Sequence, residues 1–359
     1  KRSFNYITFK INGYQKKLII EQVVFKFLKK KIERNFLYFY KKYFLNPTLR
    51  CVLPYFYVNF KDAYLTTIKL MKQKRLIGLN DIFNFFLIRS FFSLTYFRNQ
   101  IGIRESNDII EDKNFTYPLK KNSILKDIHL KGHSDVFKLK ESLKDNLLLE
   151  ILTNLEDSKI IYNDTNSKFK KLNFVNKREI DEYLKINDIH LIKSKLDLTK
   201  TIFLKKIFLD NFFIELAKDY LNDDKISVHT SFFISNTKNL SSPILGAQKY
   251  HHDVDFKKFF KVFIYFSDVL DSDNGAHTFI PYSHAKKNIK NYLASGFDTS
   301  QIEKDYAFKK IFLGEEGTVF MEDTFGIHKG LSVIKGTRLA LIIEFGKGHS
   351  QVDKNPQYI

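Results

Sequence analysis

The sequence predicts an α+β protein in which helices precede a mostly antiparallel sheet or barrel. Its 359 residues are 44% hydrophobic, enough to bury a core in one large domain or two ordinary ones. Helical periodicity dominates the middle of the chain, and short β-type runs separated by turn residues begin near residue 226. This order predicts a carboxyl-terminal β core with helices ahead of it.

The first hundred residues form a basic region. Residues 1–100 hold 20 Lys and Arg against 4 Asp and Glu, a balance of +16, whereas residues 101–359 hold 39 against 36, a balance of +3. A general bias of composition toward lysine would raise the charge of both parts alike. The asymmetry therefore predicts a basic surface in residues 1–100 that meets an anionic partner.

The same basic region is rich in aromatic side chains and is expected to be mainly helical. Residues 25–45 place apolar and basic side chains at spacings typical of amphipathic helices, and residues 82–97 form an apolar stretch interrupted by Arg89. Neither reaches the roughly 20 uninterrupted apolar residues of a membrane-spanning helix. Binding to a membrane surface and a helical domain with a solvated lysine face explain the pattern equally well.

Residues 101–359 are assigned to a second domain with its β core from about residue 226. Residues 135–158 and 197–222 have helical periodicity, and the Asn- and Asp-rich residues 162–169 indicate a loop. The runs that read as strands are "SVHTSFFIS", "FKVFIYFSDV", "AHTFIPYS", "GTVFMED" and "TRLALIIEF".

The stretch "YHHDVDF" indicates a metal site. Side chains alternate along a strand, so His251 and Asp253 would project to one side and His252 to the other. His328, which follows the strand-like "GTVFMED", is the candidate third ligand. Two histidines and one carboxylate on one face of a metal ion, with the opposite positions open, are typical of non-haem Fe(II) oxygenases. For an isolated H-x-D, the alternative is a surface cluster of polar residues.

Further motifs in the same order resemble the phytanoyl-CoA dioxygenase-like family of Fe(II)/2-oxoglutarate oxygenases. They are His251-His252-Asp253, Tyr265-Phe266-Ser267-Asp268-Val269, Asn274-Gly275-Ala276, Pro281-Tyr282-Ser283-His284, Gly317-Thr318-Val319-Phe320, His328-Lys329-Gly330 and Arg338. Tyr282 stands where the family usually has Gly, and Ala276 where it has Pro, so both departures touch turns. The resemblance covers residues 200–350 and leaves residues 1–100 uncovered.

The resemblance implies a double-stranded β-helix, a jelly roll whose two sheets enclose the iron. His251, Asp253 and His328 are implied as ligands of Fe(II), with 2-oxoglutarate and dioxygen as co-substrates. Because the carboxylate of Asp253 is present, the implied reaction is hydroxylation with release of succinate and CO2. A catalytically inactive jelly-roll binding protein is the alternative. His284 is expected to be structural, and His252 to pack or to meet solvent.

Two basic residues are candidates for binding 2-oxoglutarate. The run from His328 to Arg338 reads as two strands joined through Lys335-Gly336, which would return Arg338 to the neighbourhood of His328. The guanidinium of Arg338 could then pair with the far carboxylate of 2-oxoglutarate. Lys261 lies on the strand after H-x-D and is a second candidate contact, with a surface lysine as the alternative.

No motif identifies the substrate, and only the basic residues 1–100 offer a clue. They favour a small-molecule or lipid- or glycan-linked substrate at an anionic membrane surface, with the protein peripheral on the inner face. A nucleic-acid-associated oxygenase is the alternative, since lysines interleaved with aromatic rings fit both partners. The single cysteine, Cys51, excludes an internal disulfide, so we expect a cytoplasmic location.

Overall fold

The structure is a computed structural model, and its two compact units are Lys1–Phe91 and Phe92–Ile359. The described residues are 6–11, 14–19, 102–104, 111–112, 114–117, 119–162, 166–209, 211–237, 246–285, 297–347 and 357–358.

The first unit contains an antiparallel hairpin of β1 (Tyr6–Ile11) and β2 (Tyr14–Ile19). This hairpin departs from the mainly helical structure predicted for residues 1–100. The two strands flank Asn12-Gly13, a dipeptide typical of two-residue hairpin turns. The prediction of helices rested on the spacing of apolar residues and did not include this dipeptide. The predicted helical and apolar stretches at 25–45 and 82–97 lie outside the described residues.

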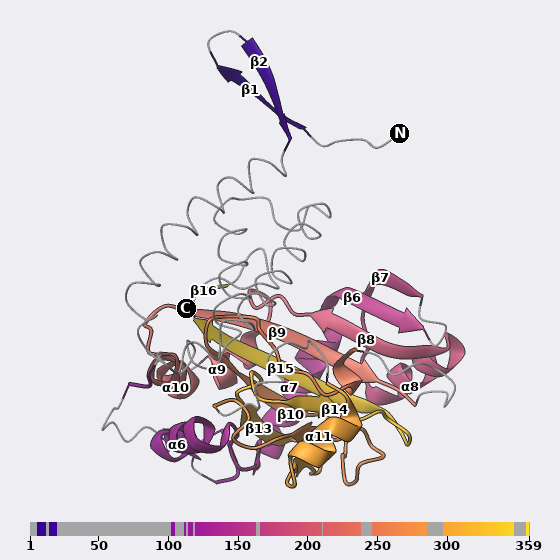
Figure 1. The fold of residues 1–359 in the computed structure, drawn as a ribbon. Helices are drawn as coiled ribbons and strands as arrows, with labels where there is room; N and C mark the ends of the chain where they lie inside the picture. Colours follow the sequence, from indigo (N-terminus) through magenta and orange to yellow (C-terminus); the bar gives the residue numbers. More distant parts are fainter. Residues whose placement is uncertain are drawn as a thin grey trace. The chain divides into compact units, whose positions relative to one another are not determined.

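The second unit is built around a nine-stranded antiparallel sheet (Figure 1). In spatial order its strands are β5 (Phe137–Lys138), β13 (Thr318–Glu322), β10 (Phe259–Tyr265), β15 (Arg338–Lys347), β9 (Ile226–Ser235), β8 (Ile189–Lys195), β6 (Leu155–Tyr162) and β7 (Ser167–Leu172), and β16 (Gln357–Tyr358) also pairs with β9. The sheet contains the strands predicted from four of the five β-type runs.

A smaller antiparallel sheet contains the fifth predicted strand. Its order is β12 (Lys310–Phe312), β11 (His277–Phe279) and β14 (His328–Gly330). An isolated bridge between His251 and His328 adds one residue pair at the β14 edge. A separate short ribbon pairs β3 (Glu111–Asp112) with β4 (Leu119–Lys120).

Most of the described helices pack on one face of the large sheet. The described helices are α6 (Lys121–Lys131), α7 (Glu141–Thr153), α8 (Lys177–Ile186), α9 (Ile202–Phe208), α10 (Asn211–Leu221) and α11 (Thr299–Asp305), with the short 3-10 helix η2 at Gly246–Gln248. The helix predicted at 135–158 is shorter, because α7 ends at Thr153 and β6 begins two residues later. The periodicity at 197–222 belongs to two helices, α9 and α10.

The two faces of the large sheet have different surroundings. One face packs on the helices, with Phe232 of β9 and Leu341 of β15 in the same core as Phe213 of α10. The other face packs against the small sheet, where Phe320 of β13 stacks on Phe312 of β12 at a centroid distance of 4.0 Å. Alternate residues of each strand therefore belong to different cores.

The sheet begins earlier in the chain than the predicted start near residue 226. Strands β6, β7 and β8 extend it to one side, at the right of Figure 1. Their exposed positions carry lysines, as in the pattern of β7, whose first five residues are all exposed. The lysines of β8 interrupt the buried positions Ile192 and Ser194, so the apolar pattern of this strand is weak and no strand was predicted there.

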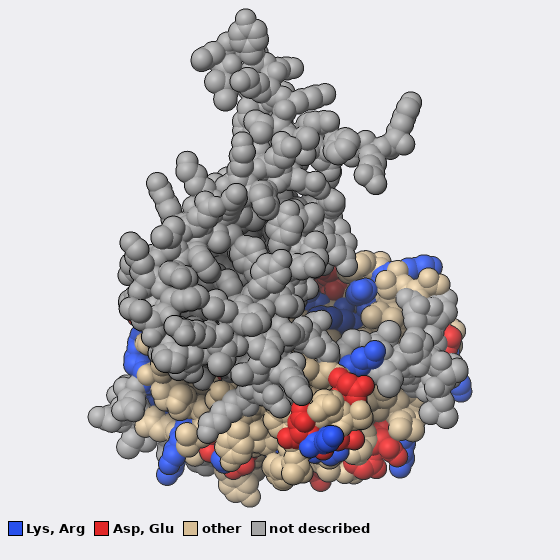
Figure 2. Space-filling model, in the orientation of Figure 1, with Lys and Arg blue, Asp and Glu red and all other residues tan. Residues whose placement is uncertain are grey.

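Charges of both signs are interspersed on the visible face of the described residues (Figure 2). The mixture fits the near balance of charge counted for residues 101–359. The basic region of residues 1–100 has no described side chains, so its predicted surface stays a prediction. Among the helices that the structure describes, none combines the length and the apolar composition needed to cross a bilayer.

Candidate metal centre

Backbone pairing brings the two candidate histidines together. The backbone N–H of His251 donates to the carbonyl of His328 at 2.9 Å, and the N–H of His328 donates back to the carbonyl of His251 at 2.9 Å. Two residues on, the N–H of Asp253 donates to the carbonyl of Thr324 at 2.9 Å. The chain after His251 is not a strand. His251 and Asp253 therefore lie on the same side because of these hydrogen bonds, and not because of the predicted alternation of side chains along a strand.

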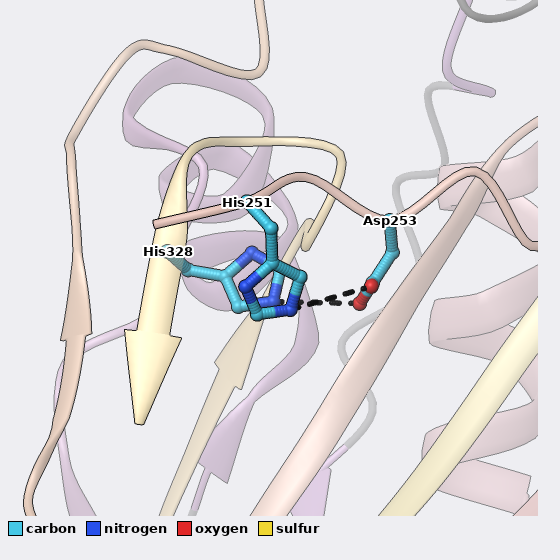
Figure 3. A group of neighbouring side chains, drawn as sticks. All are labelled: His251, Asp253 and His328. Atoms are coloured by element: carbon cyan, nitrogen blue, oxygen red, sulfur yellow. Dashed lines mark ion pairs between the residues drawn. The ribbon is translucent and has the colours of Figure 1, made fainter. Parts of the chain in front are cut away.

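The three side chains converge (Figure 3). The Nε2 atom of His251 lies 3.7 Å from Oδ1 of Asp253, and the Nε2 atom of His328 lies 3.4 Å from Oδ2. The ligand atoms of the three residues all lie within 4.8 Å of one another. The predicted triad is therefore assembled from one loop and one strand of the small sheet.

Both imidazoles have the tautomer that metal binding requires. Nδ1 of His251 lies 2.8 Å from the carbonyl oxygen of Lys249, and Nδ1 of His328 lies 2.9 Å from that of Gly326. A carbonyl oxygen only accepts, so each Nδ1 carries a proton, and Nε2 is the ring nitrogen that remains to bind a metal ion. Two imidazole nitrogens and one carboxylate fit a divalent transition metal.

The protonation states of the three residues differ. Burial, together with the neighbouring His328, lowers the pKa of His251 to about 4, so this ring is neutral near pH 7. Burial disfavours the charged form of Asp253, but the ammonium of Lys261 and the neighbouring His328 hold its pKa well below the usual value. Burial also disfavours the charged form of His328, yet the carboxylate of Asp253 raises its pKa, so a proton on this ring would be released when a metal ion binds.

The triad faces a cavity of about 450 Å³ between the two sheets. The wall from the large sheet includes residues of four neighbouring strands, namely Lys261, Phe263 and Tyr265 of β10, Arg338, Ala340, Ile342 and Glu344 of β15, His229, Ser231, Phe233 and Ser235 of β9, and His190, Leu191 and Lys193 of β8. His277 of β11 and His328 of β14 line it from the small sheet. This volume is suited to a small molecule beside the metal ligands.

Arg338 lines the same cavity as the triad. It begins β15 in the large sheet, whereas His328 begins β14 in the small sheet, so the two strands predicted from this run lie in different sheets. Its Nη1 donates to the carbonyl of Gly275 and its Nη2 donates to Oγ of Ser235 at 3.2 Å. Its Nε is buried without a hydrogen-bond partner, and among the described residues no carboxylate acts on its charge. Arg338 is thus a cavity-lining cation without an acidic neighbour among the described residues.

Lys261 also lies in the cavity wall, on β10 as predicted, but its contacts are with carboxylates. Nζ lies 2.8 Å from Asp253, 2.9 Å from Asp255 and 3.3 Å from Glu344. Burial opposes the charge of Lys261, yet these three carboxylates raise its pKa well above the usual value. The alternative of a surface lysine is wrong, because only 13% of the side chain is exposed.

A histidine–glutamate pair beside the triad was not predicted from the sequence. Nε2 of His277 lies 2.8 Å from Oε2 of Glu322, which is fully buried. Burial raises the pKa of Glu322 to about 8 and lowers that of His277 well below the usual value, so both are neutral near pH 7. The ring of His277 stacks on that of His328 at 5.5 Å. In the predicted strand run "AHTFIPYS", His277 is two residues before Phe279, so both side chains point to the same face; this spacing could have indicated that His277 faces the core.

The two remaining histidines of the motifs are not part of the triad. His252 is buried and stacks on Phe325 at a centroid distance of 5.5 Å. His284 is also buried, and its Nε2 lies 3.0 Å from the carbonyl oxygen of His129. Both are placed among packing contacts rather than with the candidate ligands.

A second acidic group, Glu141, Asp145 and Glu316, also brings three carboxylates together. The ammonium of Lys144 contacts all three. Because this ammonium offsets much of their charge, and two of the three are exposed, we assign no metal to them.

No family model and no curated protein matches the sequence. Similar solved structures include AviO1 from Streptomyces viridochromogenes Tue57, with 12% identity and a TM-score of 0.42 over 66% of this chain and 98% of that chain. HygX from Streptomyces hygroscopicus, with nickel and 2-oxoglutarate bound, has 11% identity and a TM-score of 0.40 over 64% and 87%. The non-haem α-ketoglutarate-dependent epimerase SnoN from nogalamycin biosynthesis has 11% identity and a TM-score of 0.36 over 58% and 84%. At such values the function of this chain has to be inferred from its own residues.

Proposed function

We propose that the protein is an Fe(II)- and 2-oxoglutarate-dependent dioxygenase of the phytanoyl-CoA dioxygenase-like type, with a double-stranded β-helix as its catalytic core. The observation that carries this proposal is the convergence of His251, Asp253 and His328 on one side of a cavity between two sheets. Two imidazoles and one carboxylate leave the remaining metal positions open for a co-substrate and dioxygen.

The chain's own residues have separable tasks in this proposal. His251, Asp253 and His328 would hold Fe(II), which when bound supplies the oxidation of a substrate C–H bond coupled to decarboxylation of 2-oxoglutarate. The backbone carbonyls that accept from the two Nδ1 atoms keep both rings in place. The sheets on both sides exclude bulk water from the cavity.

Arg338 would bind the end of 2-oxoglutarate that lies away from the iron. Its guanidinium is held by Gly275 and Ser235 and retains an unpartnered Nε in the cavity wall. A charge-assisted contact to a carboxylate would satisfy this donor. The neighbouring Tyr265 hydroxyl, which accepts from the backbone N–H of His277 and donates to the carbonyl of Phe312, stiffens the wall beside it.

The reaction we propose is hydroxylation of a small-molecule or lipid- or glycan-linked substrate, with residues 1–100 holding the protein at an anionic membrane surface. The positive charge of that region supports this partner. A nucleic-acid-associated oxygenase and an inactive binding protein are the competing functions. The complete triad and the unpaired Arg338 favour a catalyst over a binding protein.

Metal uptake tests this proposal. We expect one Fe(II) per chain, measured anaerobically by metal analysis after gel filtration, and severe loss of uptake in His251→Ala, Asp253→Ala and His328→Ala, because two ligands hold a labile divalent ion poorly. His252→Ala is the matched control, since its ring packs on Phe325, and it should bind iron normally. If the wild-type protein takes up no divalent metal ion, the proposal is wrong.

A further inference from the structure

Lys261 is a buried cation surrounded by three carboxylates, and one of them is the candidate ligand Asp253. Its ammonium has three N–H donors and lies 2.8 Å from Asp253, 2.9 Å from Asp255 and 3.3 Å from Glu344. Two of these donors form hydrogen bonds, one with Asp253 and one with Asp255, and Glu344 lies nearby without a hydrogen bond to the ammonium. The described hydrogen bonds of Lys261 are therefore with acidic side chains of the protein.

The sheet register holds Lys261 in this position. Lys261 lies directly opposite Glu344 on β15 and opposite Glu322 on β13. Asp255 reaches the ammonium from the loop that also carries Asp253. The lysine is therefore attached to the rigid sheet, while the ligand that it contacts lies on irregular backbone.

The contact distinguishes the two oxygens of Asp253. Oδ2 accepts from Nζ of Lys261 at 2.8 Å, whereas Oδ1 lies 3.7 Å from Nε2 of His251 and has no lysine contact. An ammonium draws electron density from the oxygen that it binds, so Oδ2 becomes the weaker metal donor. A carboxylate held in this way is disposed to bind a metal ion through one oxygen.

We propose that Lys261 is a positioning residue that keeps Asp253 in one-oxygen coordination and so preserves an open metal position for 2-oxoglutarate. This inference rests on the proposed function. Asp255, at 2.9 Å, is a second carboxylate that keeps the ammonium in the cavity wall. Without Lys261, Asp253 could turn both oxygens to the ion and occupy the position that the co-substrate needs.

The proposal predicts opposite effects on two affinities. Removing a positive charge beside a divalent ion lowers the repulsion that the ion meets, so Lys261→Met should bind Co(II), used in place of Fe(II), as tightly as the wild type or more tightly. Its affinity for 2-oxoglutarate should fall about tenfold or more, because a coordination position is lost. General damage to the site would lower both affinities together.

The visible spectrum of the Co(II)-loaded protein reports the coordination directly. Without 2-oxoglutarate, Lys261→Met should show weaker absorption bands, as expected for one additional oxygen ligand, and Lys261→Gln, which keeps a donor for Oδ2, should retain the wild-type spectrum. Lys121→Met is the matched control, because Lys121 is also a largely buried lysine and pairs with Asp219 at 2.6 Å in another part of the fold. It should lose stability without any change of the Co(II) spectrum.

The outcomes separate this inference from the proposed function. If the wild-type protein takes up no divalent ion, both fail. If it does take up a divalent ion, and Lys261→Met has an unchanged Co(II) spectrum, then Lys261 does not position Asp253. If that variant with the unchanged spectrum also binds 2-oxoglutarate more weakly, Lys261 contacts 2-oxoglutarate directly. Should Lys261→Met not fold, as judged by circular dichroism, Lys261→Met/Glu344→Gln removes one unpaired carboxylate and provides the same measurement.

Discussion

Each residue of the candidate centre is held by a contact that lies outside the triad. His251 and His328 donate from Nδ1 to carbonyl oxygens two residues earlier in the chain, and Asp253 accepts from Lys261. The histidine contacts are local, so they follow from the backbone shape around each ring. The contact of Asp253 depends instead on the position of another element, because Lys261 belongs to strand β10 of the large sheet.

Arg338 provides a test of co-substrate binding. Arg338→Ala should weaken the binding of 2-oxoglutarate to the iron-loaded protein by roughly 10- to 100-fold, since a charge-assisted contact contributes about 1.5–3 kcal/mol. The measurement is an anaerobic titration of the visible absorption band of the iron-bound keto acid. Arg178→Ala removes an exposed arginine from α8 and serves as the control, with no expected change. Equal binding by both variants would exclude Arg338 as the anion site.

Tyr282 provides a test of backbone strain. It has a φ of 66° in the turn Pro281–Ser283, a region that disfavours side chains with a Cβ. Its ring is 56% exposed, so little packing is lost on its removal. Tyr282→Gly should raise the free energy of unfolding by up to about 1 kcal/mol in urea denaturation. Tyr282→Ala keeps the strain, and an equal gain in both variants would show that the left-handed backbone is not the cause.

Elements far apart in the sequence are joined by a few buried polar contacts. The best defined of these joins α6 and α10, where Lys121 Nζ lies 2.6 Å from Oδ2 of Asp219, with 1% and 3% of the two side chains exposed. On the same α10 helix, Tyr220 donates its hydroxyl hydrogen to Asp323, which follows β13 and comes shortly before the candidate ligand His328. These contacts connect the helical layer to the segment that carries this candidate ligand.

The buried pair predicts a large effect of a single substitution. Asp219→Ala should lower the free energy of unfolding by about 3–5 kcal/mol, because Lys121 would be left buried without its partner. Chemical denaturation measures it. In the partly exposed pair Lys131–Asp127 on α6, Asp127→Ala should cost less than about 1 kcal/mol. The prediction fails if the two substitutions have similar effects.

At the scale of the whole molecule, the charge is divided between two regions. Residues 1–100 carry a balance of +16, whereas the rest of the chain, with all the proposed ligands, carries +3. The proposed membrane attachment and the proposed chemistry therefore belong to different parts of the chain and can be separated by truncation.

We expect the full-length protein to sediment with anionic lipid vesicles and not with neutral ones. Each lysine or arginine near the surface contributes about 1 kcal/mol that salt screens, while burial of Phe and Leu is not screened, so part of the binding should persist in salt. Removing residues 1–100 should abolish the sedimentation and leave iron binding intact. A protein that binds nucleic acid and ignores vesicles would instead show a steep loss of affinity with salt.

The sequence by itself determined which side chains could hold a metal ion and in what order the main elements occur. H-x-D and a later histidine after a strand name all three candidate ligands, because ligand chemistry is a property of residue types. Strands β9, β10 and β15 were also predictable, since their buried residues form nearly continuous apolar runs bounded by turn residues.

Only the tertiary structure decided the partners of the charged residues and the full width of the large sheet. Lys261 could be read as a ligand contact or a surface lysine until strand register placed Glu344 opposite it and a loop brought Asp255 to it. The lysine-rich β7 pairs with β6 at the edge of a sheet whose core lies elsewhere. Periodicity records which face of an element is buried, but pairing between distant segments depends on register, which no local pattern contains.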